Sequence, residues 1–400
     1  MSSPANIWPE SPGAKPTDYK SIALLSAAHL FDDINQGVVP AMLPFFIAAG
    51  HLSYAAAAGL VLAQTLFSSV VQPLFGLLAD RRPSAWLIPV GLSFAGIGVA
   101  LTGLTHRYDL IFAAIAMSGL GISAFHPEAA RRVRHCGHAQ ATTMSLFTVG
   151  GMAGFAIGPL LITPTLIALG TGGAVLLAVP VLLMALAVAY HLPRLAAAMA
   201  PHSIVPGSGA VVDARERWND FARLTVVVVL RSTVFYGLNT FIPLYWTSVL
   251  QGSKTGGGLA LTTLSTAVVG GTLIGGRTAD RYGRRIVIVV SLASLALLLL
   301  MFVRSYSVTT AAMLLVPIGI ALAASSSVLV VMGQEYLPNR LGLAAGVTLG
   351  LSMTIGGLLM PLFGSIADSH GLSMPMYLLS CIAAAGFMVG LTLHETSEGV

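Results

Sequence analysis

Four polar side chains interrupt an otherwise apolar segment near the start of the chain. They are His29, Asp32, Asp33 and Gln36, and their spacing places them along one face of an α-helix. Asp33 lies about 20 Å beyond Lys20 at about 1.5 Å per residue, which is near the middle of a membrane-spanning helix. A carboxyl group in such a place could gain and lose a proton, and Asp33 is the first candidate, followed by Asp32. The imidazole of His29 is a further candidate for proton coupling. The alternative is a carboxylate that is permanently paired with a neighbour or a helix end.

A lone arginine, Arg231, lies near the middle of another apolar segment. Because a charged side chain costs roughly 2.5–3.5 kcal/mol there, it tends to face a cavity. A guanidinium can hold a phosphonate or carboxylate through two hydrogen bonds, so Arg231 is a candidate substrate ligand. The alternative is a structural pair with an aspartate of the first segment. Tyr236 and Asn239 follow at roughly helical spacing and could line the same site with Gln36, although such residues more often bond neighbouring helices.

A third group of ionisable residues lies at the end of the apolar segment around residues 108–130. Glu128 and His126 stand there beside Arg131 and Arg132. Glu128 could relay protons, with His126 titrating in the useful range. Glu128 could equally be a static salt-bridge partner of the arginines, and the sequence leaves these two roles open.

These residues must be positioned by membrane helices. The chain has 400 residues, of which 56% are hydrophobic and 9% charged, and its mean hydropathy is +0.85. A soluble protein needs a far larger charged surface. Twelve apolar segments are long enough to span a bilayer, which predicts an all-α membrane protein of twelve transmembrane helices. They cover approximately residues 20–48, 54–79, 84–105, 108–130, 139–169, 172–191, 221–250, 258–279, 286–304, 307–334, 341–367 and 374–394.

The distribution of basic residues predicts the orientation in the membrane. Most of the 20 lysines and arginines lie in both tails and in every second loop, and the exceptions are Arg107, Arg231, Lys254 and Arg304. The positive-inside rule therefore places both termini in the cytoplasm. The predicted divisions are a tail at 1–19, a six-helix bundle at 20–191, a Pro- and Gly-containing connector at 192–220, a second bundle at 221–394 and a tail at 395–400.

An acid–base cluster recurs at the same place in each half. Residues 76–82 read Gly-Leu-Leu-Ala-Asp-Arg-Arg, and residues 276–285 read Gly-Arg-Thr-Ala-Asp-Arg-Tyr-Gly-Arg-Arg. This repeat predicts two pseudo-symmetric six-helix bundles. An aspartate at the cytoplasmic end of a helix can pair with arginines or a helix terminus, and so form a latch that depends on conformation. The candidate gating residues are Gly76, Asp80, Arg81, Gly276, Asp280, Arg281, Gly283 and Arg284.

The repeated cluster resembles the loop motif of the major facilitator superfamily, complete in the second copy and with Pro83 in place of a glycine in the first. Gly154, Gly158 and Pro159 are similar to the Gly-x-x-x-Gly-Pro motif of drug/proton antiporters, although close helix packing with a proline kink explains them equally well. Residues 29–36, 125–128, 145–151 and 334–340 together resemble the fosmidomycin-resistance family of efflux transporters. This resemblance implies the major facilitator fold and export of a small anionic, phosphonate-type antibiotic in exchange for protons.

Motifs of other protein classes are missing from the sequence. There is no Walker-type phosphate loop, no Cys/His cluster with metal-ligand spacing and no serine-nucleophile elbow, so we expect a transporter, with no enzyme activity, cofactor or metal. The expected partners are a small anionic substrate, protons and the lipid of a bacterial inner membrane, without nucleic acid, and we expect a monomer. The alternatives are a proton-coupled transporter of an organic acid or other metabolite and, with less support, a membrane sensor or a membrane enzyme.

Overall fold

The computed structural model describes residues 17–50, 52–81, 84–136, 140–197 and 216–395, and these residues form helices without a strand. The helices of the first half are α1 (Tyr19–Gly50), α2 (Tyr54–Ser69), α3 (Gln72–Arg81), α4 (Leu87–Leu101), η1 (Thr102–Leu104), α5 (Tyr108–His135), α6 (Gln140–Leu169), η2 (Thr171–Leu177), α7 (Ala178–Tyr190) and α8 (Leu192–Ala197). Those of the second half are α9 (Trp218–Ser248), α10 (Lys254–Tyr282), α11 (Arg284–Val303), α12 (Val308–Ala324), α13 (Ser326–Tyr336), α14 (Leu341–Ala345), η3 (Gly346–Leu351), α15 (Ser352–Leu358), α16 (Met360–His370) and α17 (Ser373–Gly390).

The predicted all-α membrane fold is confirmed. Eleven stretches of the described chain are long and apolar enough to cross a membrane. α1 supplies a twelfth, because its 32 residues exceed the length of a membrane span although its polar stripe lowers its hydropathy. Several spans consist of more than one helix, and the most broken one runs through α14, η3, α15 and α16.

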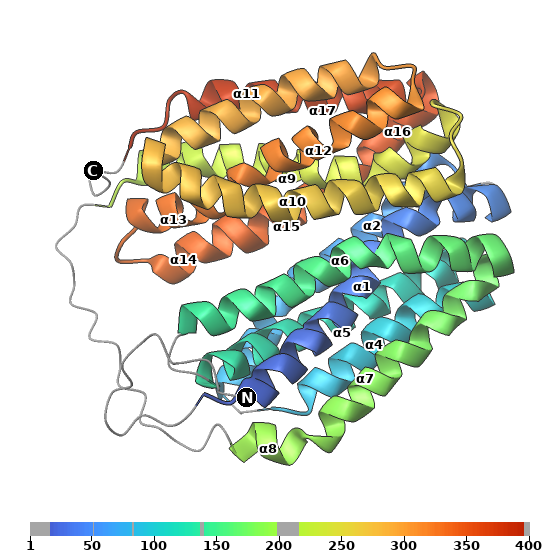
Figure 1. The fold of residues 1–400 in the computed structure, drawn as a ribbon, viewed down its shortest axis with the longest axis vertical. Helices are drawn as coiled ribbons and strands as arrows, with labels where there is room; N and C mark the ends of the chain where they lie inside the picture. Colours follow the sequence, from blue (N-terminus) through green and yellow to red (C-terminus); the bar gives the residue numbers. More distant parts are fainter. Residues whose placement is uncertain (1–16, 51, 82–83, 137–139, 198–215, 396–400) are drawn as a thin grey trace, which may run out of the picture.

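The helices form two groups (Figure 1). α1 and α4 to α8 lie in one group and α9 to α17 in the other, while α2 lies at their junction and packs against α16. We call the side where α1 begins and α17 ends the terminal side, and the opposite side the far side. The predicted connector is helical at its ends, in α8 and the first turn of α9. Residues 1–16, 198–215 and 396–400 lie outside the described part, and the domain limits assigned from sequence stay a prediction.

Two hydrophobic clusters show where the groups are joined. The larger cluster contains the core of the second group together with the far-side half of α1, from Ile34 to Phe46, and part of α2. The smaller cluster lies within the first group and includes Leu25 and Ala28, from the terminal-side half of α1. The two groups therefore share a core on the far side, and this shared core does not extend to the terminal side.

α1 packs closely against α6. Gly150, Gly154 and Gly158 lie one turn apart on α6, and Pro159 follows inside the same helix. A Cβ atom on each glycine would meet a main-chain oxygen of α1, on Ser26, Leu30 and Ile34 respectively. Small residues allow membrane helices to approach in this way. This contact holds the polar face of α1 in a fixed position.

The start of α1 is anchored on the terminal side. The Asp18 carboxylate accepts hydrogen bonds from Arg194 of α8, at 2.5 and 3.1 Å, and from Ser21. Burial raises the pKa of Asp18, but these hydrogen bonds outweigh burial and lower the pKa to about 2. Asp18 is therefore ionised at neutral pH and ties α1 to α8.

We expect Gly154→Ala to destabilise the protein, because the added methyl group would press on the main chain of Leu30. Overpacking of this kind costs about 1–3 kcal/mol. The apparent melting temperature in detergent should fall by several degrees. Gly270→Ala is the matched control, since a Cβ at Gly270 meets no atom within 4 Å. Equal melting temperatures for the two variants would contradict the proposed role of the α1–α6 contact.

Candidate functional site

A cluster of three ionisable side chains joins α1 to α5 in the first group. His29 Nε2 lies 3.2 Å from His126 Nε2, and the Asp33 carboxylate lies 3.3 Å from His29 Nε2 and 3.4 Å from His126 Nε2. We call His29, Asp33 and His126 the proton cage. Three residues from the sequence-predicted proton-coupling set thus meet at one point.

The hydrogen bonds of the cage determine what it can hold. His29 Nδ1 donates to the Phe147 carbonyl at 2.7 Å, and His126 Nδ1 donates to the Ile122 carbonyl at 2.9 Å. Because a carbonyl oxygen only accepts, both Nδ1 atoms carry hydrogen, and each Nε2 offers a lone pair to the cage only when its imidazole is neutral. With both imidazoles neutral, two lone pairs at 3.2 Å repel unless a cation lies between them. The cage can therefore hold one shared cation beside a carboxylate.

A proton or a metal ion meets that description. One nitrogen or oxygen from each of the three residues lies within 4.8 Å of the others, which is close enough for a common metal ion. Histidine ligands in metal sites also donate their second nitrogen to a carbonyl, as here. From the sequence we expect no metal.

Asp32 and Gln36 border the cage. Asp32 is fully buried, its carboxylate lies 3.4 Å from His126 Nδ1, and neither of its oxygens has a hydrogen-bond partner in the described chain. Gln36 donates to Asp33 at 3.2 Å. Asp32 therefore lies behind His126 without a hydrogen bond to offset its burial, whereas Gln36 orients the Asp33 carboxylate.

Two residues of α6 shape the cage and were not assigned a role from the sequence. The Phe147 ring stacks on His29 with centroids 4.0 Å apart, and its carbonyl fixes the imidazole. A Cβ at Gly151 would collide with the His29 ring and lie 2.5 Å from Asp33 Oδ2. Both belong to the stretch 145–151 that carries part of the family resemblance. Only their packing against α1 reveals what they do.

Arg231 presents a partly free guanidinium from α9. Its Nη1 donates to the Leu322 carbonyl at 3.1 Å and to Ser326 Oγ at 2.8 Å, on either side of the break between α12 and α13. Its Nε is buried without a hydrogen-bond partner among the described residues. Nε and Nη2 form the edge that matches two oxygens of a carboxylate or phosphonate. No ion pair joins Arg231 to either aspartate of α1 in the described structure.

Tyr236 and Asn239 follow Arg231 on α9 in different environments. Asn239 is buried and donates to the Phe235 carbonyl of its own helix at 2.9 Å. Tyr236 packs on Gly356 of α15, where a Cβ would lie 2.8 Å from the ring. Phe235 reaches Phe155 of α6, with ring centroids 6.1 Å apart. This part of α9 thus lies at the contact between the two groups of helices.

Glu128 lies with arginines, apart from the cage. It is fully buried and pairs with Arg132, at 2.8 Å to Nε and 2.6 Å to Nη2, and with Arg131 at 3.4 Å. Arg132 also bonds the Leu195 carbonyl of α8. The geometry favours the salt-bridge role of Glu128 over the relay role.

In the second copy of the loop motif, only some of the charged residues make ion pairs. Arg284 pairs with Glu335 of α13, whereas Asp280 is exposed without a hydrogen bond or ion pair in the described chain. The Arg281 guanidinium lies 5.2 Å from the Tyr282 ring centroid. Gly283 has φ +93°. A Cβ added at Gly276 would lie 3.9 Å from Ser327 Oγ. In the first copy, Gly76 has open space around it, and the side chains of Asp80 and Arg81 lie outside the described structure.

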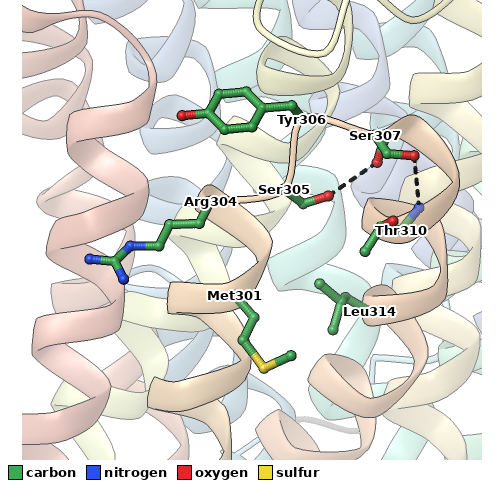
Figure 2. A pocket seen from close by; sticks show the side chains of 7 residues that line it. All are labelled: Met301, Arg304, Ser305, Tyr306, Ser307, Thr310 and Leu314. Carbon is green, nitrogen blue, oxygen red and sulfur yellow. Dashed lines mark hydrogen bonds between the residues drawn. The ribbon is translucent and has the colours of Figure 1, made fainter.

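A surface pocket of about 640 Å³ lies between the far ends of α11 and α12, away from these residues (Figure 2). Arg304 points away from Ser307 and Thr310, where the Thr310 backbone N–H donates to Ser307 Oγ at the start of α12. None of the sequence-predicted site residues lines it. The candidate functional site is therefore the proton cage together with Arg231.

We expect Glu128→Gln to destabilise the protein by about 3–5 kcal/mol, because it leaves Arg132 charged and buried without its anion. The double variant Glu128→Leu with Arg132→Met should regain much of that loss, since it removes both charges. Melting temperature in detergent measures both effects. A Glu128→Gln protein that melts like wild type but loses proton-linked transport would restore the relay role.

Known proteins place this chain in a family. A family model described as Major Facilitator Superfamily matches residues 25–347 and 224–399. The fosmidomycin resistance protein of Escherichia coli is 28% identical over 93% of this chain and 92% of its own length. An uncharacterized MFS-type transporter of Bacillus subtilis, YfnC, is 27% identical over 96% of this chain and 94% of its own.

Solved structures share the fold. A bacterial homologue of the human lysosomal transporter Spinster, in an inward-facing and occupied conformation, superposes with a TM-score of 0.79 at 17% identity, over 96% of this chain and 100% of that one. The nucleoside transporter NupG superposes with a TM-score of 0.76 at 14% identity, over 93% of this chain and 98% of that one. The family model covers most of the sequence and the fold agrees, so this chain is a membrane transporter, not an enzyme, and belongs to the major facilitator superfamily.

Proposed function

We propose that this transporter exports a small anionic drug, such as fosmidomycin, in exchange for protons across the bacterial inner membrane. The drug class comes from the similarity to the fosmidomycin resistance protein. The single observation that carries the proposal is the free edge of Arg231, a guanidinium held by Leu322 and Ser326 in the middle of a membrane span. Both termini would lie in the cytoplasm, so the terminal side would face inward.

Arg231 supports recognition of an anion. Its Nη1 is fixed by two acceptors, and its Nε has no hydrogen-bond partner in the described chain, so the edge formed by Nε and Nη2 is oriented for a bidentate contact. A pre-oriented fork loses less entropy on binding than a mobile one. A phosphonate or a carboxylate supplies the matching pair of oxygens, and Tyr236 would stand one turn further along α9.

The proton cage supports coupling. With the shared proton present, the two imidazoles carry one positive charge next to Asp33. When the proton leaves, the Nε2 lone pairs repel and the carboxylate is uncompensated, so the two states differ in both charge and geometry. A ligand that offers a hydroxyl donor to Asp33 would bind after the proton has left. Drug and proton would then exclude each other, as exchange requires.

A second candidate function is co-transport of a proton with an organic acid. Arg231 and Asp33 carry opposite charges on α9 and α1, two helices that pack against each other. An anion at Arg231 is repelled by a deprotonated cage and tolerated by a protonated one. Electrostatics alone therefore favours an anion and a proton that travel together, whereas exchange needs the ligand to bond Asp33 directly. A single chain contains both helix groups, and we propose that it works as a monomer.

The direction of proton movement distinguishes exchange from co-transport. We would add fosmidomycin outside inverted vesicles that have no imposed pH gradient and follow lumen pH with a trapped dye. Exchange drives protons outward and makes the lumen alkaline, whereas co-transport makes it acidic. We expect alkalinisation in wild type and none in Asp33→Asn. In Arg231→Ala we expect the initial rate to fall at least about tenfold, because a charge-assisted double contact is lost.

Exposed residues of the same types provide matched controls. Asp109→Asn and Arg304→Ala remove charges on the far side, and both should behave like wild type. No pH change in vesicles that hold folded protein would reject proton coupling for this drug. A full response in Asp33→Asn would remove Asp33 from the proton path.

A further inference from the structure

Asp368 joins the two helix groups at the far side. It lies in the last turn of α16 and accepts a hydrogen bond from Tyr54 N at 2.7 Å and from Ala55 N at 3.0 Å. These are the first two residues of α2, which lies more than 300 positions earlier in the sequence. A carboxylate of one group thus caps a helix of the other.

This cap completes the start of α2. The first amides of a helix have no partner within the helix, and its N-terminus favours a negative charge. Ser53 satisfies only Ala56 N, and the first turn of α2 has no acidic residue of its own. Asp368 therefore supplies both the missing acceptors and the missing charge, and its hydrogen bonds are of the strong, charge-assisted kind.

The main chains also touch beside this cap. Gly364 lies one turn before Asp368 on α16, and a Cβ there would be 2.6 Å from Ala55 Cα and from Tyr54 O. Further along α2, a Cβ at Gly357 of the preceding helix, α15, would be 2.7 Å from the Thr65 side chain. Movement of α2 away from α16 would therefore break the Asp368 bonds and expose this seam.

The position of Asp368 in its own helix makes the contact conditional. A negative charge in the last turn of a helix is unfavourable, because that end carries partial negative charge. α16 ends two residues later, at His370. Asp368 is destabilising for α16 by itself and becomes favourable only when the start of α2 docks on it.

We propose that Asp368 is the latch of the far-side-closed conformation: it is made when α2 and α16 meet and broken when the transporter opens to the far side. The latch sets the population of the two conformations and does not depend on the substrate or on proton coupling. Its test therefore needs no transported molecule, and failure of the proposed function would leave it standing.

The test measures how often the far side opens. Ala58 is fully buried and lies one helical turn beyond Tyr54, which places it on the same face of α2 as Tyr54. In a background without Cys136 and Cys381, Ala58→Cys would be labelled with a maleimide in detergent. We expect Asp368→Ala to raise the labelling rate at least about tenfold, since two charge-assisted hydrogen bonds are lost. Asp368→Asn keeps the shape and one acceptor, so its rate should be intermediate.

Asp109→Asn is the matched control, because Asp109 is an exposed far-side acid whose partner, Arg107, lies two residues away in its own group. Its labelling rate should equal that of the parent. Folding is checked by a single symmetric peak in size exclusion, and Asp368→Asn carries the test if the alanine variant fails this check. Parent-like labelling in folded Asp368→Ala and Asp368→Asn would overturn the latch, as would an equal rise in Asp109→Asn.

Discussion

The cost of an unpaired charge in an apolar interior is the constraint on which this structure depends. Three ionisable groups inside the helix groups meet this constraint in different ways, whereas Asp32 is buried without a hydrogen-bond partner in the described chain. Glu128 is neutralised by Arg132 in a buried pair, and Arg231 is held by a carbonyl and a hydroxyl. Asp33 faces two imidazoles whose charge depends on one proton. Of these three arrangements, only the last pairs a carboxylate with imidazoles, whose charge can change by one proton.

That arrangement exists because two helices approach to backbone contact. The glycines at 150, 154 and 158 bring α6 onto α1, and Gly151 on the same helix leaves room for the His29 ring and the Asp33 carboxylate. Phe147, one turn earlier, offers both its ring and its carbonyl to His29. A motif that reads as simple helix packing is therefore also what places the cage. Packing and chemistry use the same face of α6.

The sequence predicts these features to different degrees, for physical reasons. Membrane spans and the polar stripe of α1 follow from local hydropathy and helical period, so both can be read from the chain. The sequence brings Asp33, His29 and His126 together only as candidates, since their meeting requires a contact between α1 and α5. It leaves Arg231 with two roles, and the observed partners, Leu322 and Ser326, are a carbonyl and a hydroxyl that no periodicity singles out. The sequence does not predict the role of Asp368, because its partners are backbone amides of a distant helix.

The cage lies at the section of α1 where the cores of the two helix groups meet. Leu25 and Ala28 belong to the core of the first group alone, whereas Ile34 and Val38 belong to the core shared with the second group on the far side. The cage residues of α1 lie between these two sections, where the helix passes from one core to the other. His29 and Asp33 thus lie where the neighbours of α1 change from one core to the other. A change in cage charge would act on the same few residues that a movement of one group against the other displaces.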